Sequence, residues 1–131
     1  MDEKKFKDPI YGYIRIDEQL VTGIVDTPEF QRLRDVVQTS YSPLYASALH
    51  NRYVHSLGVY NLGKIAANAL ENSIVKHNYL DIFPDLKSYI YTFCLACLLH
   101  DVGHAPFSHT GEKYYLKSGD RTDLHKRLVA L

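Results

Sequence analysis

A histidine–aspartate pair follows the most apolar segment of the chain. Residues 89–99 contain, besides two tyrosines, one polar residue, Thr92, and His100 and Asp101 come directly after them in the stretch LLHDVGHAPFSH. Burying a charge costs free energy unless the group is paired, hydrogen-bonded or bound to a metal ion. The pair therefore needs a partner elsewhere in the sequence.

His55 is the candidate partner. A helix is predicted to begin near His50 or Asn51, and His55 stands at the head of its apolar stripe. The stripe comprises positions at helical spacing: 55, 59, 62, 66, 69/70 and 74. Taken singly, His55 is explained as a hydrogen-bonded core histidine and His100-Asp101 as a structural pair or helix cap.

Taken together, the two motifs favour a metal site. Transition metals bind imidazole and carboxylate ligands that come from different elements. Neighbouring residues on a regular helix point about 100° apart, so His100 and Asp101 can share an ion only where the helix ends, and Gly103 provides that break. We predict that His55, His100 and Asp101 bind one divalent metal ion (Mn, Fe, Mg, Ni or Zn).

Composition limits the class of protein. The chain has 131 residues, 46% of them hydrophobic, with Lys plus Arg and Asp plus Glu at 15 each. This fits one globular domain and disfavours nucleic acid as a partner. The charged N-terminus is unlike a signal peptide, and residues 89–99 fall short of the ~20 that span a bilayer. Cys94 and Cys97 are interpreted as core residues of a cytoplasmic protein.

The predicted architecture is all-α: a helical bundle preceded by a short hairpin or extended arm. The arm covers residues 1–17 and the helical core residues 18–131, within one domain. Helices are expected over about 17–25, 28–38, 51–77, 86–100 and 107–116, with a loop at 39–49. The last segment, LHKRLVAL, has an apolar face that is cut short, which predicts a chain truncated at its C-terminus.

Four blocks of sequence resemble one enzyme family. DPIYGYI, DTPEFQRLR, HNRYVHSLGV and LLHDVGHAPFSH occur in the order found in the HD-domain phosphohydrolases, in the dGTPase-like deoxynucleoside triphosphate triphosphohydrolase branch. The resemblance implies an HD-domain helical bundle in which His55, His100 and Asp101 are three of four metal ligands. The fourth ligand in that family is an Asp farther along than this chain extends.

The same resemblance implies catalytic and substrate-binding residues. His109 and Glu112 match an acid/base pair, and at i, i+3 on a helix a carboxylate can orient an imidazole. His104 is expected to contact phosphate and act in catalysis, and His125 matches a further active-site histidine. Arg52 matches a phosphate-contacting arginine.

Two further sets of residues match functional sites of the family. Gln38 stands where relatives contact the sugar, although Thr39 replaces the leucine of the vertebrate SAM-and-HD-domain enzyme. Four other residues match the block that forms the guanine-nucleotide regulatory site of that enzyme: Asp26, Gln31, Arg32 and Arg34. Packing between helices and subunits is the alternative explanation of this block.

The implied reaction is metal-dependent hydrolysis of dNTPs to deoxynucleoside and triphosphate, by a protein that forms homo-oligomers when complete. One alternative keeps the metal centre but acts on another nucleotide. The other is a non-catalytic oligomerising or interaction module.

Chain length gives a test of these alternatives. We expect the 131-residue chain alone to hydrolyse dNTPs negligibly, because losing one charge-stabilising contact typically costs about 10²–10³ in rate and several are missing. A chain extended to the downstream Asp should release deoxynucleoside and triphosphate when manganese is added. Product chromatography on both lengths measures this, and strong activity of the short chain would contradict it.

Overall fold

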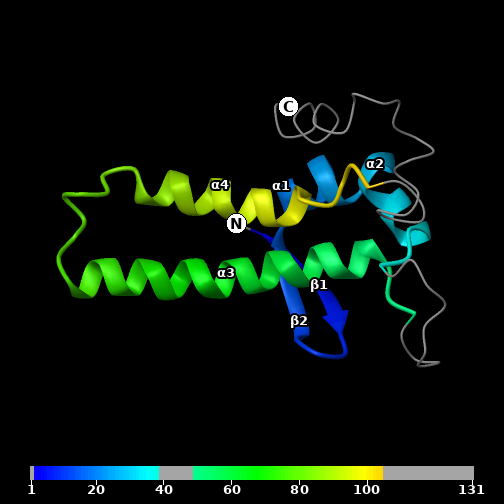
Figure 1. Cartoon of the computed structure of the whole chain (residues 1–131), viewed down its shortest axis with the longest axis horizontal. Coiled ribbons are helices and arrows are strands. Elements are labelled where there is room, and N and C mark those ends of the chain that lie inside the picture. The colour runs from blue at the N-terminus through cyan, green and yellow to red at the C-terminus, as the bar shows by residue number, and fades with distance from the viewer. Residues whose placement is uncertain (1, 39–48, 105–131) are drawn as a thin grey trace, which may run out of the picture.

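Two long antiparallel helices form the body of the protein. The computed structural model describes residues 2–38 and 49–104. In this part, α3 (Arg52–Lys76) and α4 (Leu86–Leu99) lie side by side, and the N-terminal elements pack where α3 begins and α4 ends (Figure 1). The predicted helical fold with an N-terminal hairpin is confirmed. The predicted helix at 107–116 and the last apolar segment lie outside the described residues.

The hairpin lies within the N-terminal arm that the sequence predicted over residues 1–17. Strands β1 (Glu3–Asp8) and β2 (Gly12–Asp17) pair antiparallel along their whole length. In the turn, Asp8 Oδ1 accepts hydrogen bonds from the backbone N–H groups of Ile10, at 2.8 Å, and Tyr11, at 2.9 Å. The next residue, Gly12, has a φ of 73°, which a side chain would disfavour. The turn thus fixes the register of the two strands.

Four short helical segments connect the hairpin to the body. They are α1 (Glu18–Leu20), the π-helix η1 (Val21–Val25), α2 (Pro28–Gln31) and the 3₁₀-helix η2 (Arg32–Asp35). The helix predicted over 28–38 is therefore shorter than expected. Beyond η2 the backbone is extended, and Val37 forms an isolated antiparallel bridge with Asn51, which draws the chain out of helical geometry.

One core joins the hairpin, the short helices and the two long helices. Its members are buried apolar side chains from every one of these elements except β1 and α1: Ile14, Ile16, Val21, Val25, Phe30, Leu33, Tyr53, Leu57, Tyr60, Ala67, Cys94 and Leu98. Cys94 thus lies in the core, as predicted, and burial raises the pKa of its thiol.

The apolar stripe predicted on α3 is correct at Ile74, which is buried, but wrong at most of its other positions. The buried face runs through Tyr53, Leu57, Tyr60 and Ala67, whereas Leu62 is 50% exposed. The predicted stripe consists mainly of aliphatic residues. In the structure, Tyr53 and Tyr60 face the core instead, and Gly63 allows α4 to approach α3 closely. At Gly63 an added Cβ would lie 2.8 Å from the Sγ of Cys97.

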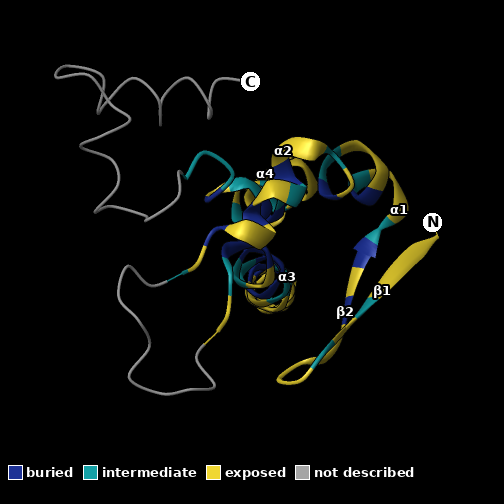
Figure 2. Ribbon diagram, turned by 90° about the vertical axis from the view of Figure 1, so that its right-hand side faces the viewer, coloured by how far each residue is buried: buried dark blue, intermediate teal, exposed yellow. Residues whose placement is uncertain are grey.

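The segment at 89–99 is also less buried than predicted. Cys94 and Leu98 are buried, but Tyr89 and Tyr91 are 62% and 56% exposed. Only one side of α4 meets α3 and the short helices in the part that the structure describes (Figure 2). Among the described residues, α3 and α4 included, there is no helix with the length and apolar character needed to cross a bilayer.

The contact at Gly63 predicts the effect of a small substitution. Gly63→Ala should lower the free energy of unfolding by about 1–3 kcal/mol, because overpacking forces neighbouring atoms apart. Urea denaturation measures it. Cys97→Ala in the same chain should restore part of the loss.

Gly23→Ala is the matched control, since an added Cβ there has no atom within 4 Å. It should leave stability within about 1 kcal/mol of wild type, because alanine is favoured over glycine in helices. A Gly63→Ala protein as stable as the wild type would contradict the proposed close packing.

Candidate metal centre

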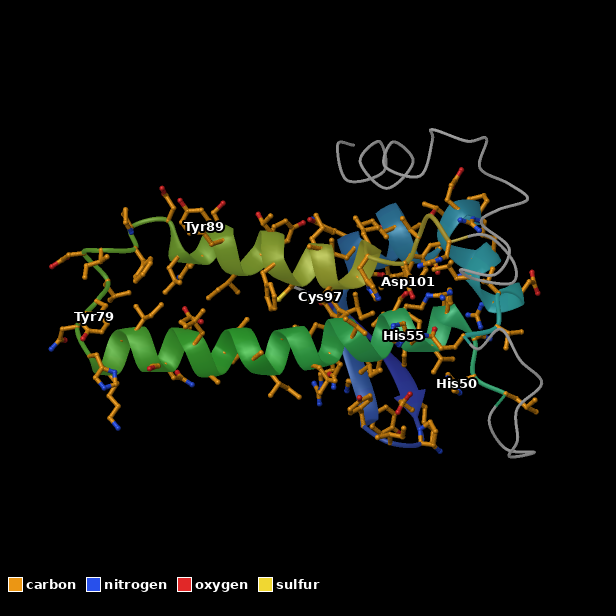
Figure 3. The ribbon with its side chains drawn as sticks, in the orientation of Figure 1. His50, His55, Tyr79, Tyr89, Cys97 and Asp101 are labelled. Carbon is orange, nitrogen blue, oxygen red and sulfur yellow. The ribbon has the colours of Figure 1, made fainter. Side chains whose placement is uncertain are left out.

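Helix ends place the three predicted ligands together. His55 lies in the first turn of α3, whose N-cap residue Asn51 accepts a hydrogen bond at Oδ1 from the backbone N–H of Val54 at 3.1 Å. His100 and Asp101 follow directly after the last residue of α4. Because α3 and α4 run antiparallel, the start of one lies beside the end of the other (Figure 3).

The spacing of these side chains suits one metal ion. One ligand atom from each of His55, His100 and Asp101 lies within 4.8 Å of the other two. The two Nε2 atoms are 3.2 Å apart, and carboxylate oxygens of Asp101 lie 3.5 Å from His55 Nε2 and 3.4 Å from His100 Nε2. Ligands at about 2.1 Å from an ion lie roughly 3.0–3.4 Å from one another in octahedral or tetrahedral geometry. The group therefore fits a divalent ion.

A backbone carbonyl orients the ring of His100. Its Nδ1 lies 2.9 Å from the carbonyl oxygen of Cys97, which can only accept a hydrogen bond. The proton of the neutral ring is therefore on Nδ1, and the lone pair is on Nε2, which faces His55. Metal-binding histidines commonly donate their other N–H to a carbonyl in this way.

The surroundings of His55 keep its ring neutral. Partial burial lowers the pKa of His55, and the field of Asp101 opposes this, while His100, Arg52 and His50 lower the pKa further. The pKa lies below its ordinary value of 6.5. A histidine must be deprotonated to bind a metal, so this site favours the form that binds.

Asp101 is held by a buried arginine. Arg52 Nη1 donates to Asp101 Oδ2 at 2.5 Å, with side chains only 5% and 7% exposed. On the other oxygen, Oδ1, the ring of His104 approaches to 3.4 Å. The resemblance predicted that Arg52 and His104 contact phosphate; the structure places both against Asp101.

Arg32 contacts the backbone of the same turn. Its Nη1 donates to the carbonyl oxygen of His104 at 2.7 Å, and its Nη2 donates to the carbonyl oxygen of Val102. Contacts to backbone oxygens have no signature in the sequence, so neither this arginine nor the Cys97 carbonyl was predicted to support the site.

The other residues of the predicted regulatory block lie away from the three ligands. Asp26 pairs with Lys4 at 3.3 Å, and Arg34 donates to Gln31 Oε1 at 2.7 Å and covers the ring of Tyr53. These contacts connect the block to the hairpin, to residues of the block itself and to α3. A regulatory nucleotide site stays a prediction.

The remaining predicted site residues are described in part or not at all. Gln38 donates its backbone N–H to His50 O at 3.2 Å, and its Oε1 is buried without a partner among the described residues. His109, Glu112 and His125 lie outside the described residues, so their roles stay predictions.

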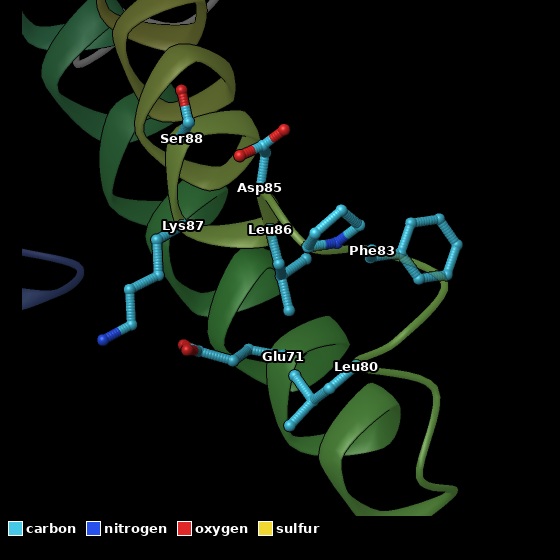
Figure 4. A pocket seen from close by; sticks show the side chains of 8 residues that line it. Glu71, Leu80, Phe83, Asp85, Leu86, Lys87 and Ser88 are labelled. Atoms are coloured by element: carbon cyan, nitrogen blue, oxygen red, sulfur yellow. The ribbon is translucent and has the colours of Figure 1, made fainter.

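A hollow of about 420 Å³ lies at the other end of the helix pair (Figure 4). Leu80 and Phe83 give it an apolar side, and Glu71 and Lys87 give it a charged side. It is formed by the α3–α4 connection, whereas the metal ligands stand where α3 begins and α4 ends. It therefore takes no part in the candidate metal centre.

Comparison with known proteins agrees with this geometry. The family described as "HD domain" matches residues 52–131, a span that contains all three ligands. A phosphohydrolase of Bacteroides thetaiotaomicron has a similar structure, with a TM-score of 0.73 and 32% identity over 97% of this chain and 30% of that one.

Curated relatives include proteins with and without an assigned activity. YwfO of Bacillus subtilis, described as uncharacterized, is 39% identical over 87% of this chain and 25% of its own. The deoxynucleoside triphosphate triphosphohydrolase SAMHD1 of Danio rerio is 35% identical over 97% of this chain and 20% of its own. The chain thus spans a quarter or less of the length of these two relatives.

The three ligands give a direct test of metal binding. His55→Ala and Asp101→Asn should each remove most of the bound metal, because a site with two remaining ligands holds a divalent ion far more weakly. Elemental analysis of the purified protein measures metal content, with circular dichroism to check folding.

His77→Ala is the matched control: it removes another histidine near the opposite end of α3, where the ring stacks on Tyr79. It should keep the full metal content. Unchanged metal in both the His55 and the Asp101 variants would show that the ion binds elsewhere.

Proposed function

The chain belongs to the HD-domain family, and from this membership we propose that it is a metal-dependent phosphohydrolase that cleaves deoxynucleoside triphosphates to deoxynucleoside and triphosphate. The observation that carries the proposal is the meeting of His55, His100 and Asp101 at the ends of two helices. The choice of dNTPs rests on the similarity to proteins named as deoxynucleoside triphosphate triphosphohydrolases.

The proposed reaction is hydrolysis at the α-phosphorus. Water adds to this phosphorus, the bond between it and the 5′ oxygen breaks, and a proton passes to the 5′ oxygen of the departing deoxynucleoside. When bound, a divalent ion supplies Lewis acidity and lowers the pKa of water. His55, His100 and Asp101 would hold it, and a downstream Asp would complete the ligand set.

The residues around the ligands then have separate proposed roles. Arg52 holds the carboxylate of Asp101 in place, and its positive charge lies close to where phosphate would bind. His104 is proposed to contact phosphate from the turn. His109, oriented by Glu112, is proposed as the acid that protonates the leaving oxygen, with His125 nearby. Gln38 is proposed to contact the sugar.

The structure also gives weight to a second substrate class. Arg52, which the resemblance assigns to phosphate, is 4% exposed and its Nη1 is bonded to Asp101. An arginine engaged in this way supports the site through Asp101. This role does not depend on a triphosphate and would serve the hydrolysis of any phosphoester. A nucleotide monophosphate or other nucleotide is therefore the alternative substrate. Assembly into homo-oligomers stays a prediction.

Labelled water tests the reaction and the substrate together. The chain extended to the downstream Asp is incubated with Mn²⁺ and with each dNTP or deoxynucleoside monophosphate in H₂¹⁸O. We expect deoxynucleoside and triphosphate as products, with ¹⁸O in the triphosphate, because water attacks phosphorus and not the sugar carbon. Chelation of the metal and His55→Ala should each abolish turnover, whereas His77→Ala should not.

Other outcomes would redirect or reject the proposal. Turnover of monophosphates alone would move the substrate to the second class. The label in the deoxynucleoside would contradict attack at phosphorus. Inactivity on every nucleotide, in a protein that binds Mn²⁺ through His55, would favour a non-catalytic module.

A further inference from the structure

Arg32 is the side chain through which the N-terminal helices reach the turn that carries Asp101. It is the first residue of η2, and its guanidinium donates to the carbonyl oxygens of Val102 and His104, some seventy positions away in sequence. Val102 follows Asp101 directly, and His104 stands three residues after Asp101 in the same turn. Arg32 is thus bonded to the backbone that sets the direction of Asp101.

We propose that Arg32 is a positioning residue of the metal centre. Its two N–H groups hold the carbonyls of Val102 and His104 and so fix the direction of the Asp101 carboxylate and the His104 ring. This inference rests on the proposed metal centre, but it assigns to Arg32 a role different from the nucleotide contact that the resemblance implied.

Backbone hydrogen bonds hold the turn after α4 in part. The α4 helix ends at Leu99, and among the described residues two backbone hydrogen bonds continue beyond it: from Val102 N–H to Leu99 O and from His104 N–H to Asp101 O, each 3.0 Å. Carbonyl groups past the end of a helix have no helical N–H to accept from. Arg32 supplies donors to two of them, on either side of Gly103, the most flexible residue type in the turn.

The backbone next to Arg32 is anchored by buried side chains. The neighbouring residue Leu33 and the preceding Phe30 are both 0% exposed in the core. The ring of Phe30 also packs edge-on against Tyr53 of α3, with centroids 5.6 Å apart. Arginine suits the task because its planar fork presents two donors at fixed geometry, whereas lysine presents one nitrogen at the end of a flexible stem.

Charge and position predict opposite effects of removing Arg32. The guanidinium is a cation near a cation-binding site, so its charge opposes metal binding. If charge were its only influence, a neutral residue at position 32 would bind Mn²⁺ more tightly. If Arg32 positions Asp101, the neutral residue binds Mn²⁺ more weakly. The sign of the change separates the two.

The test measures the Mn²⁺ affinity of the chain extended to the downstream Asp by titration calorimetry, without nucleotide. Arg32→Met keeps the apolar stem and should weaken binding by about 10–100-fold, the usual loss when support behind a metal ligand is removed. Arg32→Lys should fall between Arg32→Met and wild type. Arg15→Met is the control, because Arg15 is an exposed hairpin arginine whose ion pair with Glu3 lies in β1 and β2; it should bind as the wild type does.

A second measurement needs no metal. Hydrogen exchange at the amides of Val102 and His104 should be faster in Arg32→Met, while the amide of Ala67 within α3 keeps its wild-type rate. A general loss of stability would instead speed all three amides. Should Arg32→Met fail to fold, Mn²⁺ affinity and hydrogen exchange are both measured on Arg32→Lys instead.

Unchanged or tighter Mn²⁺ binding in Arg32→Met or Arg32→Lys, with unchanged exchange at the turn, would overturn the inference. Failure of the metal centre itself has a different signature: wild type and His55→Ala would then bind Mn²⁺ equally. In that case exchange at Val102 and His104 still decides whether Arg32 holds the turn.

Discussion

The buried ion pair between Arg52 and Asp101 is the interaction on which the rest of the site depends. It joins the first residue of α3 to the turn after α4 at 2.5 Å, with both side chains nearly inaccessible to water. Removing one partner of such a pair leaves an uncompensated buried charge and costs about 3–5 kcal/mol. The packing of the two long helices and the direction of the carboxylate are therefore coupled.

Neighbouring groups of the protein also contact the candidate ligands. Asp101 is held by Arg52, and His100 is turned by the carbonyl of Cys97, 2.9 Å from its Nδ1. His55 stands in the first turn of a helix capped by Asn51. Asp101 and His100 thus each have a partner that fixes the direction of the side chain, and this lowers the entropy lost when a metal or substrate is bound.

The N-terminal elements contribute to the same centre without supplying a ligand. The hairpin buries Ile14 and Ile16 against the core, and the short helices that follow bring Arg32 to the carbonyls of Val102 and His104. Residues near the start of the chain are in this way connected to the turn near residue 101. The block that contains Arg32 has a structural use in this chain, alongside any binding role.

The sequence by itself identified the three candidate ligands and the helices that carry them. The start of α3 at Asn51 and the capping of α2 by Thr27 depend on local side-chain chemistry, and a polar pair at the end of an apolar helix requires a partner. Tertiary structure alone decided which face of α3 is buried, because that depends on where Gly63 lets α4 approach. It also decided that Arg52 serves Asp101 and that Arg32 holds backbone carbonyls, since such contacts join residues distant in sequence and leave no pattern in it.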